Sequence, residues 1–169
     1  KLLRTGIHVM VSDEEPVKIC NDKLLFYNKL KKLLYPVIPT YDRLNKNISS
    51  QLVVKERFGA GSKLTGINLS FSESQTFSRN LHNPIFQPFV KGDEFTIDMY
   101  VTKRKEVKGI IARERLVVVG GESKITKTLK DNQLEKLCQN LALDLNLYGH
   151  VNIQCIKDNK NDYNIVECN

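Results

Sequence analysis

The chain has 169 residues, of which 41% are hydrophobic and 27% charged, and its formal net charge is +7. This composition is typical of one soluble globular domain with its own core, and it excludes a low-complexity or fibrous chain. No apolar run approaches the roughly 18 residues of a membrane span. Residues 1–12 are too interrupted for a secretory signal, so we expect a cytoplasmic protein without a membrane partner.

The positive charge leaves a nucleic-acid-binding protein open as an alternative. The basic residues are dispersed, however, and they do not interleave with aromatic residues as in proteins that bind single strands. A phosphate-bearing small ligand accounts for the charge equally well, and so does a lysine-rich proteome. We therefore expect no nucleic-acid partner.

The N-terminal residues predict the last turn of a helix, a cap at Gly6 and then a strand. Asp22 is a suitable N-cap for a helix over about residues 23–34, where apolar residues recur at helical spacing. Pro36 and Pro39 end that segment. Both ends of the chain stop abruptly, so we expect a piece of a longer protein.

The stretch QLVVKERFGAGSK, residues 51–63, predicts a short strand that reaches Lys55 and opens into a glycine-rich loop. Gly59 and Gly61 permit backbone turns that aim main-chain N–H groups at an anion. The spacing fits neither a P-loop nor a dinucleotide-binding fingerprint, and a kinase lysine follows its glycine loop instead of preceding it. A phosphate-covering loop and an ordinary hairpin turn remain the two alternatives.

A strand at about residues 66–71 precedes a helix that we expect to begin at Ser72. After Pro84, closely spaced β segments predict an antiparallel sheet over residues 85–90, 94–101, 107–119 and 124–129. The next helix is capped by Asp131 and ends at Gly149. Its apolar face comprises Leu134, Leu137, Cys138, Leu141 and Leu145.

The last two β segments predict a hairpin with one polar and one apolar face. If its turn is centred after Lys160, one face carries Asn152, Gln154, Glu167 and Asn169. The other face carries Val151, Ile153, Cys155, Val166 and Cys168. Compact oxygen ligands beside one carboxylate suit Mg²⁺ bound with a nucleotide, because phosphates supply its other ligands. A plain solvated hairpin is the alternative.

The cysteines have no C-x-x-C spacing, which argues against a zinc site and against a disulfide framework. They are Cys20, Cys138, Cys155 and Cys168. Most of them lie in apolar runs, where a free cysteine acts as a small core residue.

Three pieces of the sequence, in this order, resemble the ATP-grasp superfamily, and most closely its carbamoyl phosphate synthetase large-subunit-like branch of carboxylate–amine ligases. The pieces are VVKERFGAGSK, QPFVKGDE, and NIQ together with ECN. The resemblance covers essentially the whole chain. It implies an α+β ATP-grasp fold, in which two α/β subdomains with antiparallel sheets sandwich the nucleotide.

The same resemblance implies three segments. Residues 1–21 would be the tail of a preceding domain and a linker. Residues 22–88 would form the small subdomain with the phosphate-covering loop. Residues 89–169 would form the larger subdomain with the metal site, truncated at its C-terminus.

The resemblance also implies an ATP- and Mg²⁺-dependent ligase, in which Mn²⁺ could replace Mg²⁺. Such an enzyme activates a small-molecule carboxylate as an acyl phosphate for attack by an amine or a similar nucleophile. A non-catalytic ATP-binding module and carbamoyl phosphate synthesis itself are the alternatives. The fragment alone could be inactive, and a homodimer stays open.

The resemblance assigns roles to particular residues. Phosphate contacts fall to Lys23, Lys55, Gly59, Ala60, Gly61 and Ser62. Gln87, Phe89 and Val90 would line the adenine pocket, and Glu94 would accept from the ribose hydroxyls. The metal would be held by Gln154, Glu167 and Asn169. Arg113, Arg115 and Lys124 would lie near the acceptor phosphate, although a solvated strand face is the alternative for the arginines.

The sequence departs from the family pattern at three places. Glu56 replaces the proline that usually follows the strand lysine, and Leu64 replaces the glycine after the loop lysine. The first metal ligand, Gln154, is an amide and carries no negative charge. These changes motivate the alternative of a nucleotide-binding module without catalysis.

Overall fold

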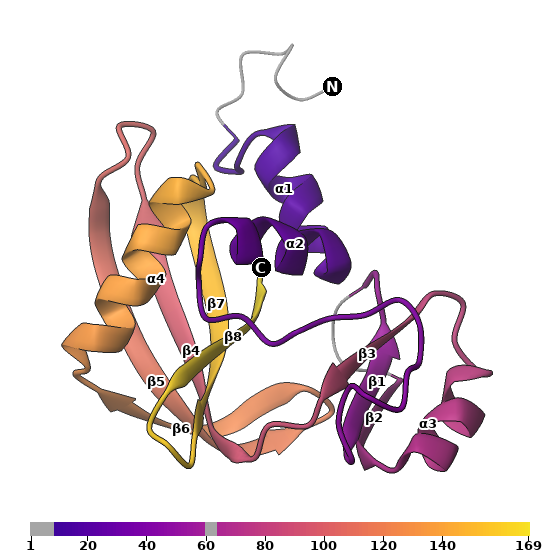
Figure 1. Ribbon diagram of the computed structural model, residues 1–169. Coiled ribbons are helices and arrows are strands. Elements are labelled where there is room, and N and C mark those ends of the chain that lie inside the picture. Colours follow the sequence, from indigo (N-terminus) through magenta and orange to yellow (C-terminus); the bar gives the residue numbers. More distant parts are fainter. Residues whose placement is uncertain (1–8, 60–63) are drawn as a thin grey trace.

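The computed structural model describes residues 9–59 and 64–169, which form two antiparallel sheets (Figure 1). The smaller sheet has the order β2–β1–β3. Its strands are β1 (Leu52–Glu56), β2 (Thr65–Leu69) and β3 (Pro84–Pro88). The larger sheet has the order β6–β5–β4–β7–β8. Its strands are β4 (Gly92–Val101), β5 (Val107–Val119), β6 (Glu122–Leu129), β7 (Gly149–Asp158) and β8 (Tyr163–Cys168).

Helix α3 (Phe71–Ser78) covers the small sheet and begins one residue earlier than predicted. The N-cap is Ser70, whose Oγ accepts from the Glu73 backbone N–H while the Glu73 carboxylate accepts from the Ser70 N–H. This reciprocal capping box fixes the helix start, so the prediction of Ser72 was wrong.

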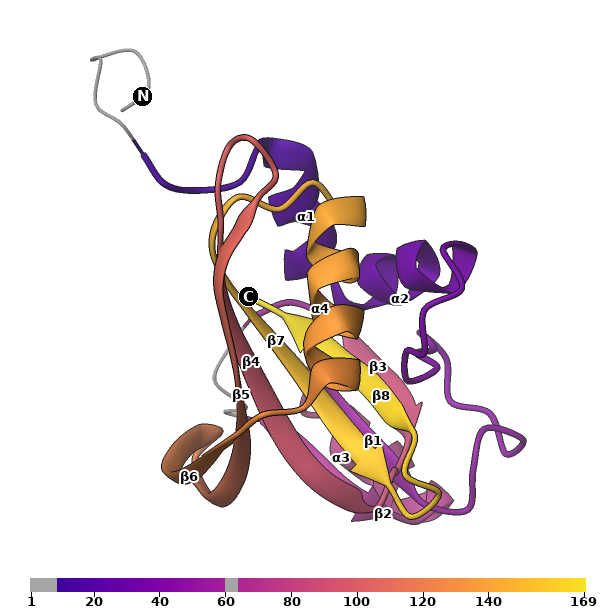
Figure 2. The same cartoon turned by 90° about the vertical axis from the view of Figure 1, so that its left-hand side faces the viewer.

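The other helices lie together on one side of the large sheet (Figure 2). They are α1 (Glu14–Asn21), α2 (Lys23–Lys32) and α4 (Asn132–Asp144). Side chains that alternate along β4, including Phe95, Ile97 and Met99, are buried in the core that these helices share with the sheet. Because strand side chains alternate, Glu94 and Asp98 point to the opposite, open face. That open face carries the polar residues of the candidate site.

The predicted caps of two helices are confirmed. Asp22 caps α2, and Asp131 caps α4 by accepting from the Leu134 N–H at 2.9 Å. Helix α4 ends at Asp144, with Leu145 as its C-cap, and not at Gly149, because Asn146 takes the left-handed conformation with φ of +55°. An asparagine tolerates this conformation and so ends the helix earlier than the predicted glycine.

The N-terminal prediction was wrong where it can be compared. Residues 9–13 form no strand, and helix α1, which was not predicted, follows directly. Gly6 lies outside the described residues. The helix buries only Pro16 and Ile19, so its apolar pattern is too sparse to reveal it in the sequence.

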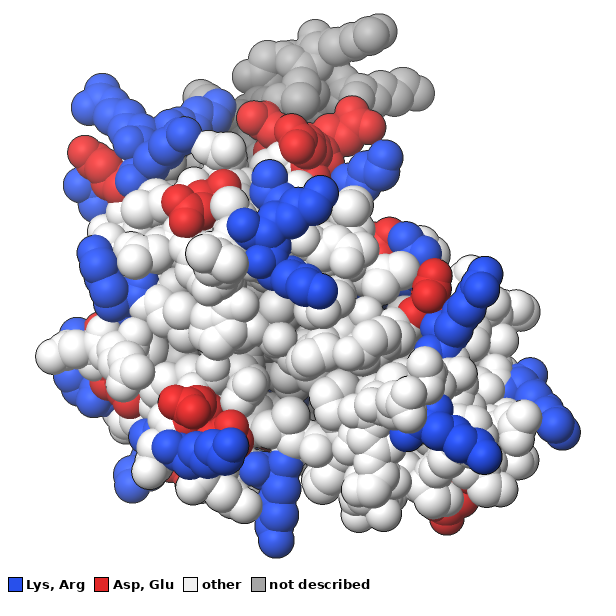
Figure 3. Space-filling model, viewed as in Figure 1, with Lys and Arg blue, Asp and Glu red and all other residues white. Residues whose placement is uncertain are grey.

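Within residues 9–59 and 64–169, the helices are all too short or too polar to cross a membrane. On the face drawn in Figure 3, lysines and arginines are spread over the surface among acidic and uncharged side chains. That face shows no continuous basic stripe of the kind that tracks a nucleic-acid backbone.

Candidate functional site

A cleft of about 770 Å³ lies between the two sheets. The small sheet contributes Lys55, and the open face of the large sheet contributes Glu94, Gln154 and Glu167. The segment that joins β3 to β4, residues 89–91, forms part of the wall. The fold thus brings together residues that are far apart in the sequence.

The β7–β8 hairpin forms part of the cleft wall on the side of the large sheet. Gln154 pairs with Glu167, as the sequence predicts, and Asn152 and Asn169 exchange two backbone hydrogen bonds of 2.8 Å. The register then shifts, since Cys155 pairs with Ile165. This irregularity turns Val166 into the cleft, so its predicted place on the apolar face was wrong.

Two lysines converge on the cleft from different elements. Lys55 lies on β1, and Lys23 is the first residue of α2, where its Nζ donates to the Gly59 carbonyl at 2.8 Å. Burial lowers the pKa of the Lys55 ammonium from 10.5 to about 8. The Lys23 charge adds to this lowering of the Lys55 pKa, while Glu167 and Glu94 oppose it. An anionic group in the cleft would offset both the repulsion and the lost hydration.

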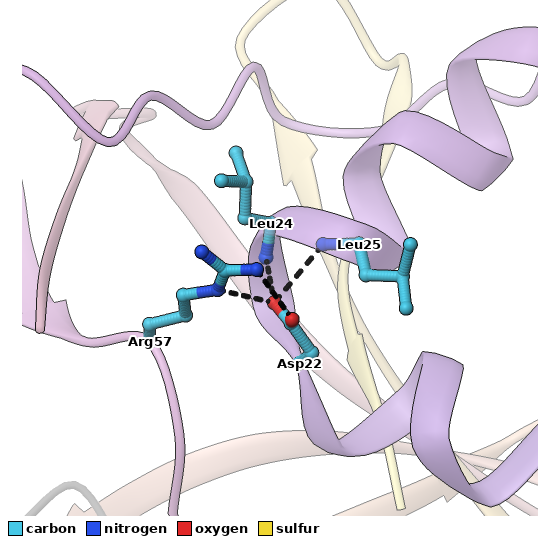
Figure 4. A network of polar contacts seen from close by, with 4 residues as sticks. All are labelled: Asp22, Leu24, Leu25 and Arg57. Carbon is cyan, nitrogen blue, oxygen red and sulfur yellow. Dashed lines mark hydrogen bonds and ion pairs between the residues drawn. The ribbon is translucent and has the colours of Figure 1, made fainter.

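Asp22 fixes both of the segments that carry these lysines (Figure 4). Its carboxylate accepts from the Leu24 and Leu25 N–H groups and from the Arg57 guanidinium, at 2.7 Å from Nε and 2.6 Å from Nη2. Arg57 follows β1, so one carboxylate joins the start of α2 to the end of the lysine strand. Asp22 is 7% exposed.

We expect Asp22→Ala to lower the free energy of unfolding by about 2–4 kcal/mol, because both a helix cap and an ion pair are lost. Asp22→Asn keeps a good cap and should cost about half as much. Burial raises the pKa of Asp22, but the hydrogen bond and charge of Arg57 and the backbone N–H groups bring it below its usual value. Asp22 therefore contributes stability above the unfolded-state pKa of about 4, and this is lost as the pH falls through the lower folded-state pKa.

Urea unfolding of the three proteins at pH 7 and at acidic pH measures these differences. The difference in the free energy of unfolding between the wild type and Asp22→Ala should be smaller at acidic pH. Equal stability of the wild type and Asp22→Ala at pH 7 would contradict the role given to this carboxylate.

The wall formed by β3 and the connection to β4 is largely apolar. Phe89 and Val90 line it, and the Phe89 N–H donates to the Gln51 carbonyl at 2.9 Å. Gln87 also lines the cleft, but it is buried and its Nε2 donates to Thr40 Oγ1 at 2.7 Å. The amide nitrogen of Gln87 therefore donates within the protein and not to a ligand. Gly92 is needed here, because a Cβ would lie 2.0 Å from the Lys157 carbonyl oxygen.

The predicted arginines and Lys124 occupy different surroundings. Arg115 lines the cleft. Arg113 is outside the cleft lining and binds Asp98, with its Nε 2.7 Å from Oδ2. Lys124 is also outside it and binds the neighbouring Glu122 at 2.7 Å.

The three residues predicted to hold a divalent ion do not all lie in the cleft. Glu167 and Gln154 line the cleft, but Asn169 does not, and Gln154 Oε1 accepts from Arg115 Nη1 at 2.9 Å. Among the described residues, no three His, Cys, Asp or Glu side chains gather as a metal site. The donors present therefore fit an ion that takes most of its ligands from phosphates and water, as Mg²⁺ does with nucleotides.

Several residues that line the cleft were not predicted, namely Ile38, Val53, Phe58, Leu64, Thr65, Ile67, Ile156 and Val166. Ile156 shares the strand face of Gln154, so alternation along β7 could have found it. Val166 depends on the register shift in the β7–β8 hairpin, and the others depend on how the two sheets meet. Ala60, Gly61 and Ser62 lie outside the described residues.

Glu56, the departure from the usual proline, has a clear local function. Its carboxylate accepts from the backbone N–H groups of His82 and Asn83, at 2.7 and 3.0 Å. These bonds attach the end of β1 to the loop before β3 and help to hold the strand that carries Lys55. They also keep the pKa of Glu56 below its usual value.

Two antiparallel sheets that enclose a cleft, with ammonium groups on one wall and a carboxylate–amide pair on the other, define a class of domain suited to a phosphate-bearing ligand. Residues 20–169 match the family model of the ATP-grasp domain, and the chain belongs to the ATP-grasp family. A comparison with curated protein sequences finds no match.

Solved structures agree on the fold. Biotin carboxylase from Campylobacter jejuni, in a β-γ-ATP complex, has a TM-score of 0.81 at 14% identity, over 99% of this chain and 44% of that one. The biotin carboxylase domain of 2-oxoglutarate carboxylase from Hydrogenobacter thermophilus, with MgADP and bicarbonate, gives 0.81 at 14%, over 99% and 43%.

The D-alanine–D-alanine ligase of Bacillus anthracis, complexed with ATP, has a TM-score of 0.73 at 16% identity, over 99% of this chain and 60% of that one. The chain thus spans roughly half the length of these similar proteins. The predicted α+β ATP-grasp fold is confirmed.

Proposed function

We propose that this domain binds Mg·ATP and serves an ATP-dependent ligase that activates a carboxylate for attack by an amine or similar nucleophile. The observation that carries the proposal is the cleft in which Lys23 and Lys55 face Gln154 and Glu167. Family membership and structures of similar proteins with bound ATP or MgADP support it.

The roles of the residues follow from their places in the cleft. Lys23 and Lys55 would neutralise phosphate oxygens as point charges. Phe89 and Val90, with the apolar side chains around them, would hold the adenine ring. Glu94, whose side chain is 47% exposed, would accept from the ribose hydroxyls.

Glu167 would supply the protein carboxylate for the divalent ion, with Gln154 beside it. A bound ion of this kind supplies charge neutralisation at phosphate oxygens. Asn169 is the weakest part of the proposed metal set, since it lies outside the cleft lining.

The proposed reaction has two steps. An oxygen of the substrate carboxylate attacks the γ-phosphorus, the bond to the β–γ bridging oxygen breaks, and ADP leaves. The amine then attacks the acyl carbon, inorganic phosphate leaves and the nitrogen loses a proton. Phosphoryl transfer of this type needs positioned charges and a site without water, which the lysines and the cleft would provide.

The domain limits remain proposals. The boundary between residues 22–88 and 89–169 falls in the segment that joins the two sheets. We also propose that the chain belongs to the carbamoyl phosphate synthetase-like branch, because the Gln154–Glu167 pair matches the metal-site motif of that branch.

The test is Mg·ATP binding by calorimetry, followed by ADP release with panels of carboxylates and amines. We expect a dissociation constant below about 1 mM, as in other enzymes that use ATP at cellular levels. Absence of Mg·ATP binding would overturn the proposal. Tight binding without ADP formation on any substrate would favour the non-catalytic alternative.

A further inference from the structure

The guanidinium of Arg115 lies in the wall of the cleft and contacts several protein groups. Its side chain is 7% exposed. Nε donates to Ser123 Oγ at 2.7 Å, and Nη2 donates to the Gly121 carbonyl at 2.7 Å. Nη1 donates to Gln154 Oε1 at 2.9 Å and lies 3.1 Å from Glu94 Oε2. One group therefore contacts residues on β4, β6, β7 and the β5–β6 turn.

Among residues 9–59 and 64–169, no side-chain hydrogen bond or ion pair other than those of Arg115 joins these partners to one another. In the sheet, Glu94 pairs with Ile156 and Gln154 pairs with Thr96. Glu94 and Gln154 are therefore not directly opposite each other. Glu94 is half-exposed and carries a flexible side chain. Without the guanidinium, the Glu94 side chain would sample other rotamers. Ligand binding would then have to order it, which costs conformational entropy.

The turn that Arg115 holds also faces the cleft. Gly120 and Gly121 line it and have φ values of +60° and +82°, which present the Gly121 carbonyl to the guanidinium. An arginine suits this task because its planar fork keeps its charge and directs several donors at fixed angles.

We propose that Arg115 is a positioning residue that holds Glu94 against Gln154 and thereby sets how the site recognises the ribose hydroxyls. The inference rests on the proposed function, because it takes Glu94 as the ribose acceptor. It differs from the sequence prediction, which placed Arg115 near the acceptor phosphate. All three guanidinium nitrogens of Arg115 already donate to protein groups, which favours the positioning role.

Arg113 provides the matched control. It lies two residues earlier on the same strand face, and its Nε and Nη2 bind Asp98. Asp98 also accepts from Asn152 Nδ2 at 2.6 Å, so this second cluster lies apart from Glu94. Arg113→Met removes the same kind of side chain without releasing Glu94.

The experiment measures equilibrium binding of ATP and 3′-deoxy-ATP, both with Mg²⁺, to the whole chain. It compares the wild type with Arg115→Met, Glu94→Gln, the double variant and Arg113→Met. We expect the wild type to prefer ATP by about tenfold or more, as for a hydrogen bond to a charged group. Arg115→Met and Glu94→Gln should each bring the ratio close to one, and the double variant should lose no more.

Arg113→Met should keep the wild-type ratio. If Arg115→Met does not fold, Arg115→Lys gives the same test, since one ammonium cannot serve all four acceptors. Retention of the wild-type ratio in a folded Arg115 variant, or additive losses in the double variant, would overturn the inference alone. A wild type that binds neither nucleotide would overturn the proposed function as well.

Discussion

Lys55→Met is expected to weaken Mg·ATP binding by about 100-fold or more while making the folded protein more resistant to heat at pH 7. The affinity loss follows from removing a charge-assisted contact to phosphate in a partly dehydrated cleft. The stability gain follows from the cost of burying an ammonium group that makes no hydrogen bond or ion pair within the part of the chain that the structure describes. Function and stability are thus expected to oppose each other at this residue.

The pH dependence has a definite sign. The folded-state pKa of Lys55, about 8, lies below the unfolded value of 10.5, so the folded state binds fewer protons between these values. The free energy of unfolding of the wild type therefore gains a contribution as the pH rises from about 8 toward 10.5. The Lys55→Met protein lacks this gain, so its advantage should be largest at pH 7 and shrink in alkali.

Calorimetric melting temperatures at pH 7 and 9.5, together with ATP titrations, measure both effects. Lys127→Met is the control, since Lys127 is exposed on β6 and outside the cleft. It removes the same charge but should change ATP affinity little. ATP binding by Lys55→Met within a few-fold of the wild type would rule out a phosphate contact for this lysine.

Glu167→Gln is expected to lower the rate of ADP formation by about 1,000-fold, which corresponds to the several kcal/mol that a well-placed divalent ion contributes. The amide keeps the shape of the carboxylate but removes the charge that holds the ion. Nucleotide binding itself should weaken less, because Lys23 and Lys55 remain.

Glu122→Gln is the matched substitution for this prediction. Glu122 is exposed, pairs with Lys124 and lies outside the cleft, so ADP formation should continue at the wild-type rate. A higher Mg²⁺ concentration should partly restore ADP formation by the Glu167→Gln protein. A Glu167→Gln rate within tenfold of the wild type would leave the metal role of this carboxylate without support.

Local chemistry made part of this structure predictable. Asp22 and Asp131 were recognised as caps because a cap depends on neighbours within three residues. The Gln154–Glu167 pairing was predictable because both strands belong to one hairpin and the turn is short. The start of α3 was missed because Ser70 and Ser72 are both suitable caps and only the Glu73 contact separates them.

Other features depend on long-range geometry. Arg113 and Arg115 share a strand face, and their different surroundings are set by where Asp98 and the small sheet lie. The sequence alone could not separate them. Likewise, the place of Asn169 outside the cleft lining depends on the end of β8 and not on its residue type.

The irregular pairing within the last hairpin also bears on insertions and deletions. The residue numbers of paired positions sum to 320 near the turn and to 321 beyond it, as Cys155 with Ile165 and Gln154 with Glu167 show. Deletion of Val166 would remove the extra residue, and regular alternation from Ile165 would leave Glu167 opposite Gln154 on the cleft face and Cys168 in the core. The loss of one residue at this point would therefore keep the charged group in the cleft and would remove only the Val166 side chain from its wall.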